Sequence, residues 1–405
     1  MTALCACSGA ARMMPASEAA ADAVPEPSAP AETPPEEEGA QTAPLPDPED
    51  GAEVQAEASD ENIEPPAPLM TPCRTLLWID GAQTETYTAA EGGIYIRPED
   101  AAAALGGTFA PEEKDALLNA AGTQLRLIGG SAFLLRSGEP VRMSAPALTD
   151  GDAWYAPAAD LLPLLGLTAL EDPELDQVYY THIVKNDAVE EGYEIPVLMY
   201  HAVGDEIWGV PELFVSPSRL EAQLQALQEK GYTAITFEDL ECIGKIEKPV
   251  MLTFDDGYDD NYTNLFPLLK KYNVKATIFV ITDAVGYEHY LTREQIREMS
   301  DSGLVSIQSH TVTHGYLDGM DEEQLVREHY DSMIALARIT GKQPFVLCYP
   351  SGRSSSASRQ ITAQYYEFAL NMTGPRYETG DDPYRIWRSY ISRDTDIYTF
   401  LSKIR

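Results

Sequence analysis

Two acidic residues directly follow an apolar run in the second half of the chain. Asp255 and Asp256 come immediately after Pro249–Phe254, whose side chains are typical of a buried strand. Carboxylates at the carboxyl end of a strand occupy the place where α/β barrels carry their catalytic groups. A solvated turn is the alternative, because aspartate and glycine favour turns. A calcium loop of the EF-hand type does not fit, since its glutamate at the twelfth position is absent.

Two histidines four residues apart follow another apolar run. His310 and His314 come just after Val305–Ser309, and this spacing can direct two imidazoles to one side of a helical turn. With a carboxylate from another strand end they would form a metal site that leaves positions open for water and substrate. Metal-dependent hydrolases and non-haem iron oxygenases both use such a set. The oxygenases usually place it on a double-stranded β-fold, whereas predicted helices separate the strands here.

Strands and helices alternate from Ile195 onward. The candidate strands are residues 195–200, 233–236, 250–254, 276–281, 305–309, 345–349 and 366–370. They are short apolar runs, as expected of a parallel sheet that is covered on both faces. Helix starts are predicted at Ser216, followed by Pro217, and at Thr292, where Gln295 completes a capping box. This pattern predicts an α/β fold, a distorted (β/α) barrel of about seven strands.

Three segments of this half resemble one known family. The runs LTFDDGYDDNY, KKYNVKATIFV and GLVSIQSHTVTHGYL are similar to carbohydrate esterase family 4, the polysaccharide deacetylases with a NodB homology domain. The likeness covers residues 194–405. It implies that Asp255 is the general base and that Asp256, His310 and His314 hold Zn²⁺ or another divalent transition metal.

A fourth segment resembles a turn that lines the substrate groove in this family. In Leu347-Cys348-Tyr349-Pro350-Ser351-Gly352, the resemblance implies that Ser351 donates its backbone N–H to the developing oxyanion. Ser351 stands where the family usually carries an aromatic residue. Tyr349, Pro350 and Tyr258 are predicted to contact the substrate. Thr311 is predicted to brace the histidine loop without touching the metal.

Two more residues take roles from a permuted branch of the family that includes poly-N-acetylglucosamine deacetylases. That branch carries its general-acid histidine in an N-terminal PVLMYH strand, and Pro196–His201 has this sequence. His201 is therefore the predicted acid, with a core histidine as the alternative. Ile386-Trp387-Arg388 matches the place of an arginine that orients the catalytic aspartate. A surface ion pair is the alternative for Arg388.

An internal repeat predicts a smaller α+β accessory domain over residues 73–185. The repeated residues are Tyr95, Asp100, Leu105 and Gly106 in the first copy and Tyr155, Asp160, Leu165 and Gly166 in the second. Each copy is predicted as a strand, a short helix and a return strand. The arrangement resembles the copper amine oxidase N-terminal-like domain, and it implies neither copper nor oxidase activity. Without metal-ligand spacing, it is predicted to be a spacer or a cell-wall-binding unit.

Residues 1–72 are predicted to form an N-terminal tether. Leu4-Cys5-Ala6-Cys7-Ser8-Gly9 resembles a bacterial lipobox with Cys7 as the lipidated residue, although the usual upstream basic and apolar regions are missing. An unremarkable N-terminus is the alternative. From Pro15 to Pro72, alanine, proline and glutamate dominate, and such a segment cannot bury enough apolar surface to order itself.

The negative net charge of the chain excludes some classes of binding partner. Its 405 residues carry a formal net charge of −37, which argues against nucleic acids and anionic membrane surfaces, so that membrane contact is expected only through a lipid anchor. The sequence thus predicts an extracellular or cell-surface enzyme that removes N-acetyl groups from an amino-sugar polysaccharide, of the peptidoglycan or poly-N-acetylglucosamine type. The alternatives are a non-catalytic glycan-binding wall protein and an O-acetyl esterase acting on a xylan-like polymer.

Overall fold

The structure is a computed structural model, and it describes residues 69–405. The predicted lipobox with Cys7 and nearly all of the predicted tether lie outside the described residues. Within residues 69–405, every helix falls short of the length and apolar composition that a bilayer-spanning segment requires.

Seven parallel strands close into a barrel in the second half of the chain. In order around the ring they are β16 (Val197–Tyr200), β26 (Ile386–Tyr390), β24 (Phe368–Thr373), β23 (Val346–Cys348), β22 (Val305–Ser309), β21 (Ala276–Val280) and β20 (Pro249–Phe254). The ring closes because β16 pairs in parallel with both β20 and β26. Every residue of β16, β21, β22 and β23 is buried, which explains their continuous apolar runs. The predicted seven-stranded barrel is confirmed.

The membership of the ring differs from the prediction in one strand. Residues 233–236 were expected to be a barrel strand, but β19 (Thr233–Ile235) pairs only with β20, outside the ring. Its place is taken by β26, which contains Arg388. An arginine at the centre of this five-residue strand interrupts the apolar pattern, so that local sequence does not reveal β26 as a barrel strand.

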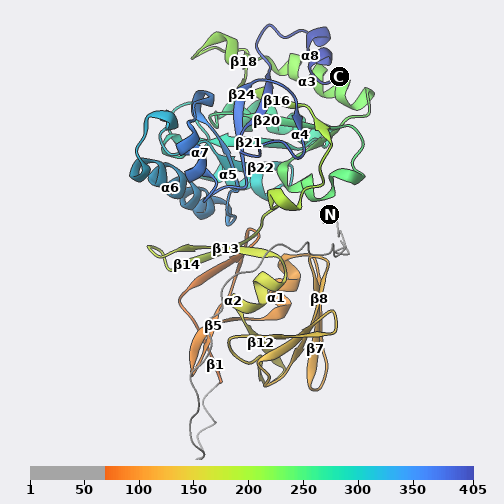
Figure 1. Ribbon diagram of the computed structural model, residues 1–405, viewed down its shortest axis with the longest axis vertical. Coiled ribbons are helices and arrows are strands. Elements are labelled where there is room, and N and C mark those ends of the chain that lie inside the picture. Colours follow the sequence, from red (N-terminus) through yellow and green to blue (C-terminus); the bar gives the residue numbers. More distant parts are fainter. Residues whose placement is uncertain (1–68) are drawn as a thin grey trace, which may run out of the picture. The chain divides into compact units, whose positions relative to one another are not determined.

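Helices surround the barrel (Figure 1). They are α3 (Pro217–Glu229), α4 (Phe266–Tyr272), α5 (Arg293–Asp301), α6 (Glu322–Thr340), α7 (Ser356–Thr362) and α8 (Ile397–Lys403). Both predicted helix starts are confirmed: the Ser216 hydroxyl accepts a hydrogen bond from the Arg219 amide, and Thr292 forms its capping box with Gln295.

Short elements connect the strands and helices of this half. The short helical segments are η1 (Asn186–Ala188), η2 (Pro211–Leu213), η3 (Phe237–Lys245), η4 (Asn261–Leu265), η5 (Thr282–Ala284), η6 (Leu317–Gly319) and η7 (Pro350–Gly352). The short strands are β15 (Glu194–Ile195), which pairs with β25 (Tyr377–Glu378), and β17 (Ala202–Val203), which pairs with β18 (Phe214–Val215). The loops that carry the candidate site residues lie among these elements.

The first half of the described chain contains three antiparallel or mixed sheets. One has the order β1 (Met70–Pro72), β4 (Tyr87–Ala89), β5 (Gly92–Ile96), β12 (Ala153–Pro157), β11 (Leu148–Asp150). A second has the order β10 (Glu139–Arg142), β9 (Phe133–Arg136), β8 (Thr123–Ile128), β7 (Asp115–Ala120), β6 (Thr108–Pro111). The third has the order β13 (Leu167–Asp172), β14 (Gln177–His182), β2 (Leu76–Ile79), β3 (Ala82–Thr84). Residues 70–72 had been assigned to the tether by their composition, yet they pair with β4 as β1.

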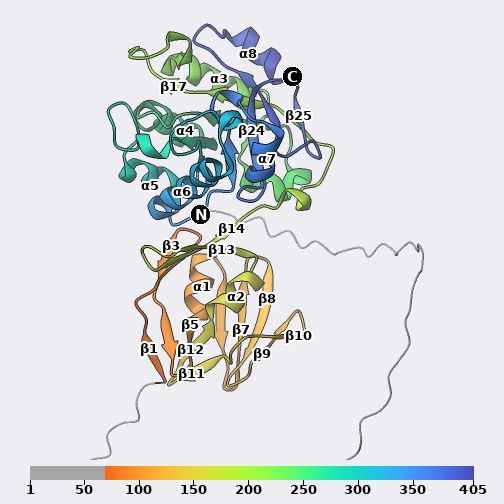
Figure 2. The ribbon, with the colours of Figure 1, turned by 60° about the vertical axis from the view of Figure 1, so that its left-hand side comes forward.

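The internal repeat appears as two strand–helix–strand units. The first is β5, α1 (Pro98–Ala104) and β6, and the second is β12, α2 (Ala158–Leu164) and β13. The repeated tyrosines lie on β5 and β12, which pair with each other in antiparallel fashion. Helices α1 and α2 lie side by side against the strands (Figure 2) and share one hydrophobic core with them. The periodicity of the sequence therefore reflects two copies of one structural unit.

The β13–β14 hairpin also contacts helix α6 of the barrel. Leu170 and Tyr179 belong to one apolar cluster with Met333. Beside this cluster, Arg338 donates to both carboxylate oxygens of Asp172, over 2.6 and 2.8 Å. An apolar contact and a bidentate ion pair thus join the hairpin to the helix.

Candidate active site

The side chains singled out in the sequence meet at the carboxyl ends of barrel strands. Asp255 and Asp256 follow β20, His310 follows β22, and His201 follows β16. Both carboxylates are buried, with 3% and 7% of their residue surfaces exposed, so that the reading of a solvated turn does not apply. Asp256 has a φ of +73°, an unusual backbone conformation for a residue other than glycine. The turn after β20 therefore directs two adjacent carboxylates into the interior.

Asp256, His310 and His314 have the donors and the arrangement of a metal site. The Nε2 atoms of His310 and His314 lie 3.4 and 3.7 Å from Asp256 Oδ1. The three ligand atoms all lie within 4.8 Å of one another. His310 Nδ1 is 2.8 Å from the carbonyl oxygen of Cys348, a contact that leaves Nε2 free for a cation. One carboxylate and two imidazoles suit a divalent transition metal.

A second group of donors shares His310 but is less suited to a cation. It consists of Asp255, His310 and the thiol of Cys348. Both oxygens of Asp255 already accept hydrogen bonds from Arg388, and the same guanidinium lies 3.1 Å from the Cys348 sulfur. A fixed positive charge at this place disfavours a metal ion.

The loop that carries the two histidines is held by hydrogen bonds from inside the protein. The amide of His314 donates to the Thr311 hydroxyl over 3.1 Å, in agreement with the predicted bracing role of Thr311. Glu328, on α6, accepts hydrogen bonds from the amides of Val312 and Thr313 and from the Thr313 hydroxyl. Glu328 lies fourteen residues beyond His314, and no local motif in the sequence marks it.

Arg388 forms a bidentate ion pair with Asp255. Its two terminal nitrogens lie 2.7 Å from the two carboxylate oxygens. Burial acts to raise the pKa of Asp255, but the charge and the hydrogen bonds of Arg388 outweigh it and hold the pKa below its ordinary value. Arg388 is itself buried, so that the alternative of a surface ion pair is excluded.

His201 lies near the same carboxylate as Arg388. Its Nε2 lies 3.8 Å from Asp255 Oδ2, beyond direct hydrogen-bond distance. Burial lowers the pKa of His201, and the neighbouring Asp255 carboxylate acts in the opposite direction. The later histidine of the chain, His329, lies inside α6, where its Nε2 contacts the Thr362 hydroxyl, and it takes no part in this site.

In the turn after β23, Ser351 is exposed and the aromatic residue Tyr349 is buried. Ser351 has a φ of +54° within η7 and is exposed. Tyr349 is fully buried in an apolar cluster with Leu347, and Pro350 is buried as well. The side chain of Tyr349 therefore supports the turn from inside, which argues against its predicted contact with the substrate.

Comparison with known proteins agrees with this geometry. The polysaccharide deacetylase profile matches residues 244–366. A poly-β-1,6-N-acetyl-D-glucosamine N-deacetylase of Staphylococcus aureus is 33% identical over 200 residues, which are 44% of this chain and 68% of that relative. The chain belongs to the polysaccharide deacetylase family. The oxygenase alternative is set aside, since the site stands on a parallel barrel.

Other relatives match the chain over different lengths. YxkH of Bacillus subtilis, which is named for the same family, is 37% identical over 169 residues; these are 40% of this chain but only 59% of YxkH, less than two thirds of its length. Among solved structures, a polysaccharide deacetylase from Bacillus cereus has a TM-score of 0.51 at 27% identity and covers 73% of this chain and 78% of its own. Streptococcus pyogenes deacetylase PplD, solved with acetate, has a TM-score of 0.50 at 28% identity and covers 53% and 99%.

An aromatic cluster adjoins the two carboxylates of the candidate site. Tyr258 is partly buried, and burial together with the nearby Asp256 raises its pKa. Its ring makes an edge contact with Trp208, which also stacks on the parallel ring of His289 at 4.3 Å between centroids and makes an edge contact with Phe214. Trp208 and His289 come from two different loops, and no motif in the sequence had indicated them.

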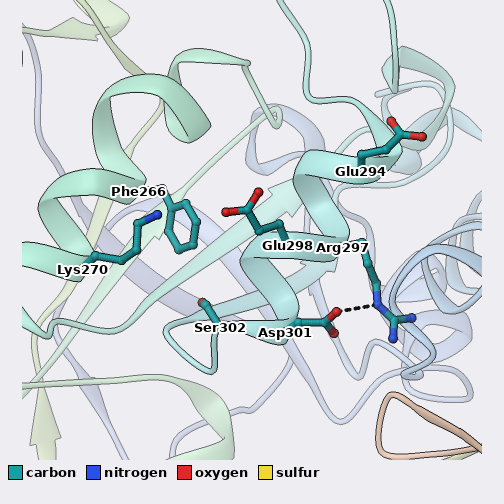
Figure 3. A pocket seen from close by; sticks show the side chains of 7 residues that line it. All are labelled: Phe266, Lys270, Glu294, Arg297, Glu298, Asp301 and Ser302. Atoms are coloured by element: carbon teal, nitrogen blue, oxygen red, sulfur yellow. Dashed lines mark hydrogen bonds and ion pairs between the residues drawn. The ribbon is translucent and has the colours of Figure 1, made fainter.

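A separate hollow lies between helices α4 and α5 (Figure 3). It is lined by Phe266, Lys270, Glu294, Arg297, Glu298, Asp301 and Ser302. The Lys270 ammonium lies 4.0 Å from the centre of the Phe266 ring, and Arg297 forms an ion pair with Asp301. None of the candidate site residues lines this hollow.

Proposed function

We propose that this deacetylase hydrolyses N-acetyl groups on an amino-sugar polysaccharide of the peptidoglycan or poly-N-acetylglucosamine type. The observation that supports this function is that two adjacent carboxylates have different neighbours. Asp256 faces two imidazoles, whereas Asp255 faces Arg388 and His201. A metal ligand and a general base would thus stand side by side, as hydrolysis of an amide requires.

The metal would be held by Asp256, His310 and His314. Zn²⁺ or another divalent transition metal suits this donor set. When bound, such an ion supplies a Lewis acid for the acetamide carbonyl and lowers the pKa of water. Glu328 and Thr311 would keep the loop with both histidines in the conformation that this binding needs.

The proton transfers are assigned to side chains of the chain itself. Asp255, kept ionised by Arg388, would accept the proton of the attacking water. The Ser351 amide would donate a hydrogen bond to the acetyl oxygen as negative charge develops there. His201 would then protonate the departing amine, because an amide nitrogen leaves poorly as an anion.

The proposal also covers the cellular location of the protein and the roles of residues 73–185 and Cys7. A polymer of this type lies outside the cell membrane, and we therefore place the deacetylase outside the cell or at its surface. Residues 73–185 would bind the cell wall, and Cys7 would carry a lipid anchor. A Staphylococcus aureus relative named for poly-β-1,6-N-acetyl-D-glucosamine supports the poly-N-acetylglucosamine type of substrate.

Acetate release tests this function directly. Purified protein is incubated with peptidoglycan, poly-β-1,6-N-acetylglucosamine, a chitin hexamer and acetylated xylan, before chelation, after chelation and after addition of Zn²⁺. We expect metal-dependent release from at least one of the amino-sugar polymers. Asp255→Asn is the matched control and should lower the rate by more than about 100-fold. Release from xylan alone would identify an O-acetyl esterase, and binding without any release would identify a glycan-binding protein.

A further inference from the structure

Tyr316 presents an exposed aromatic ring beside the candidate site. It follows His314 by two residues in the loop after β22, and 52% of its surface is exposed. The imidazole of His314 is itself 35% exposed, so that this edge of the site opens to solvent. Tyr316 has no role in the metal site or in the proton transfers described above.

The ring of Tyr316 is supported from one side. The guanidinium carbon of Arg353 lies 4.4 Å from the ring centroid. Two nitrogens of Arg353 lie 3.0 Å from Asp318 Oδ2, so that the guanidinium is itself fixed in place. Arg353 lies over the ring and about half of the residue remains exposed, so that the ring is accessible to a ligand.

The contact between Arg353 and Tyr316 connects two loops at neighbouring strand ends of the barrel. Strands β22 and β23 are neighbours in the barrel, and Ser309 pairs with Leu347. The loop after β22 carries His314 and Tyr316, whereas the loop after β23 carries the η7 turn and Arg353. A polymer that lies across these strand ends would pass over the exposed ring.

We propose that Tyr316, backed by Arg353, forms a stacking platform for a sugar ring of the polysaccharide next to the ring that carries the reacting acetamide. This inference rests on the proposed function. The face of a pyranose carries C–H groups, which match the apolar and electron-rich face of an aromatic ring. The exposed Ser351 offers no such surface at the η7 turn. A ring that is already fixed also loses little conformational entropy when it binds.

Binding and turnover of a β-1,6-linked N-acetylglucosamine hexamer test the platform separately. In the Asp255→Asn background, Tyr316→Ala should weaken the Kd for the hexamer about 5- to 30-fold. In the active protein, the same substitution should raise KM by a similar factor while kcat changes less than about twofold, because the contact is the same in ground state and transition state. Tyr316→Phe should retain tight binding, and Arg353→Ala should produce a smaller loss.

Tyr398→Ala is the matched control. This tyrosine is 81% exposed on α8, and its removal should change neither Kd nor KM. Unchanged hexamer binding by Tyr316→Ala in the Asp255→Asn background would overturn the inference, whatever the activity. A loss of binding in that variant together with no acetate release by the wild type would instead reject the proposed function and leave the platform in place.

Discussion

Arg388 and Asp255 are joined across the barrel by two hydrogen bonds of 2.7 Å. They lie on or after β26 and β20, the two strands that pair with β16. The remaining donors of Arg388 reach the Thr253 hydroxyl, the carbonyl oxygen of Asn371 and the Cys348 sulfur. The guanidinium is therefore fully committed inside the protein, and it fixes both the position and the charge of the predicted base.

Removal of Arg388 should affect both stability and activity. Arg388→Met leaves Asp255 as a buried carboxylate without its partner, which we expect to lower the free energy of unfolding by about 3–5 kcal/mol. Deacetylation should fall by more than about 100-fold, since the base is no longer held ionised. Urea unfolding and acetate release measure the two effects. Arg388→Met with Asp255→Asn should be more stable than Arg388→Met alone; equal stability would show that the unpaired charge is not the cause.

The two predicted histidine ligands should differ in their effect on the metal-free protein. His310 is buried and contacts the Cys348 carbonyl, whereas His314 is partly exposed. Either alanine variant should lose the metal, measured by elemental analysis. After chelation, only His310→Ala should be destabilised, by about 1–3 kcal/mol, because a buried carbonyl loses its donor. Retention of stoichiometric metal by His314→Ala would remove that residue from the predicted ligand set.

Glu328 should control metal affinity without contacting the metal. Glu328→Ala removes the acceptor for two amides and one hydroxyl of the histidine loop, and we expect a loss of about 10- to 100-fold in affinity for Zn²⁺. Titration against a competing chelator measures it. Glu328→Gln keeps an acceptor oxygen of the same reach and should lose far less. Excess Zn²⁺ should restore the activity of the alanine variant.

His201 should matter only where the leaving group needs a proton. His201→Gln should slow release of acetate from an amino-sugar oligomer by about 10²- to 10⁴-fold. An aryl acetate has a leaving group that departs without protonation, and its hydrolysis should fall much less. Asp255→Asn should slow both reactions, because both need an activated water. If His201→Gln slows the two substrates equally, the assignment of a general acid is wrong.

The ion pair between the β13–β14 hairpin and α6 should make stability depend on pH. Hydrogen bonds from Arg338 hold the pKa of Asp172 below its ordinary value, against the opposing effect of burial. The carboxyl is thus harder to protonate in the folded chain than in the unfolded one. The stabilisation is complete above about pH 4 and is lost as the pH falls through the folded pKa.

Thermal unfolding of Asp172→Asn measures this contribution. The variant should have a lower Tm than the wild type at pH 7, and the difference should shrink below about pH 4. Glu174→Gln is the control, since Glu174 pairs with the same arginine but is exposed, and it should change stability by less than about 1 kcal/mol. A difference that stays constant from pH 7 to pH 3 would contradict the assignment.

Local sequence patterns were sufficient to predict most strands of the barrel. Its buried strands are short apolar runs, and the caps at Ser216 and Thr292 depend only on neighbouring residues. Strand β26 escaped detection because Arg388 breaks its apolar pattern, and that arginine is tolerated only because Asp255 lies across the barrel. A polar residue inside a strand can be interpreted only when its partner is known, and here the partner lies 133 positions away.

The sequence by itself determined the chemical types at the candidate site: paired carboxylates, two histidines at a spacing of four, and further groups at other strand ends. These signals are local, because each follows its own strand. Only the tertiary structure decided which carboxylate faces the imidazoles, that Tyr349 is buried, and that Glu328 holds the histidine loop. Those relationships depend on the order of strands around the barrel and on the packing of α6, and both arise from contacts between residues far apart in the chain.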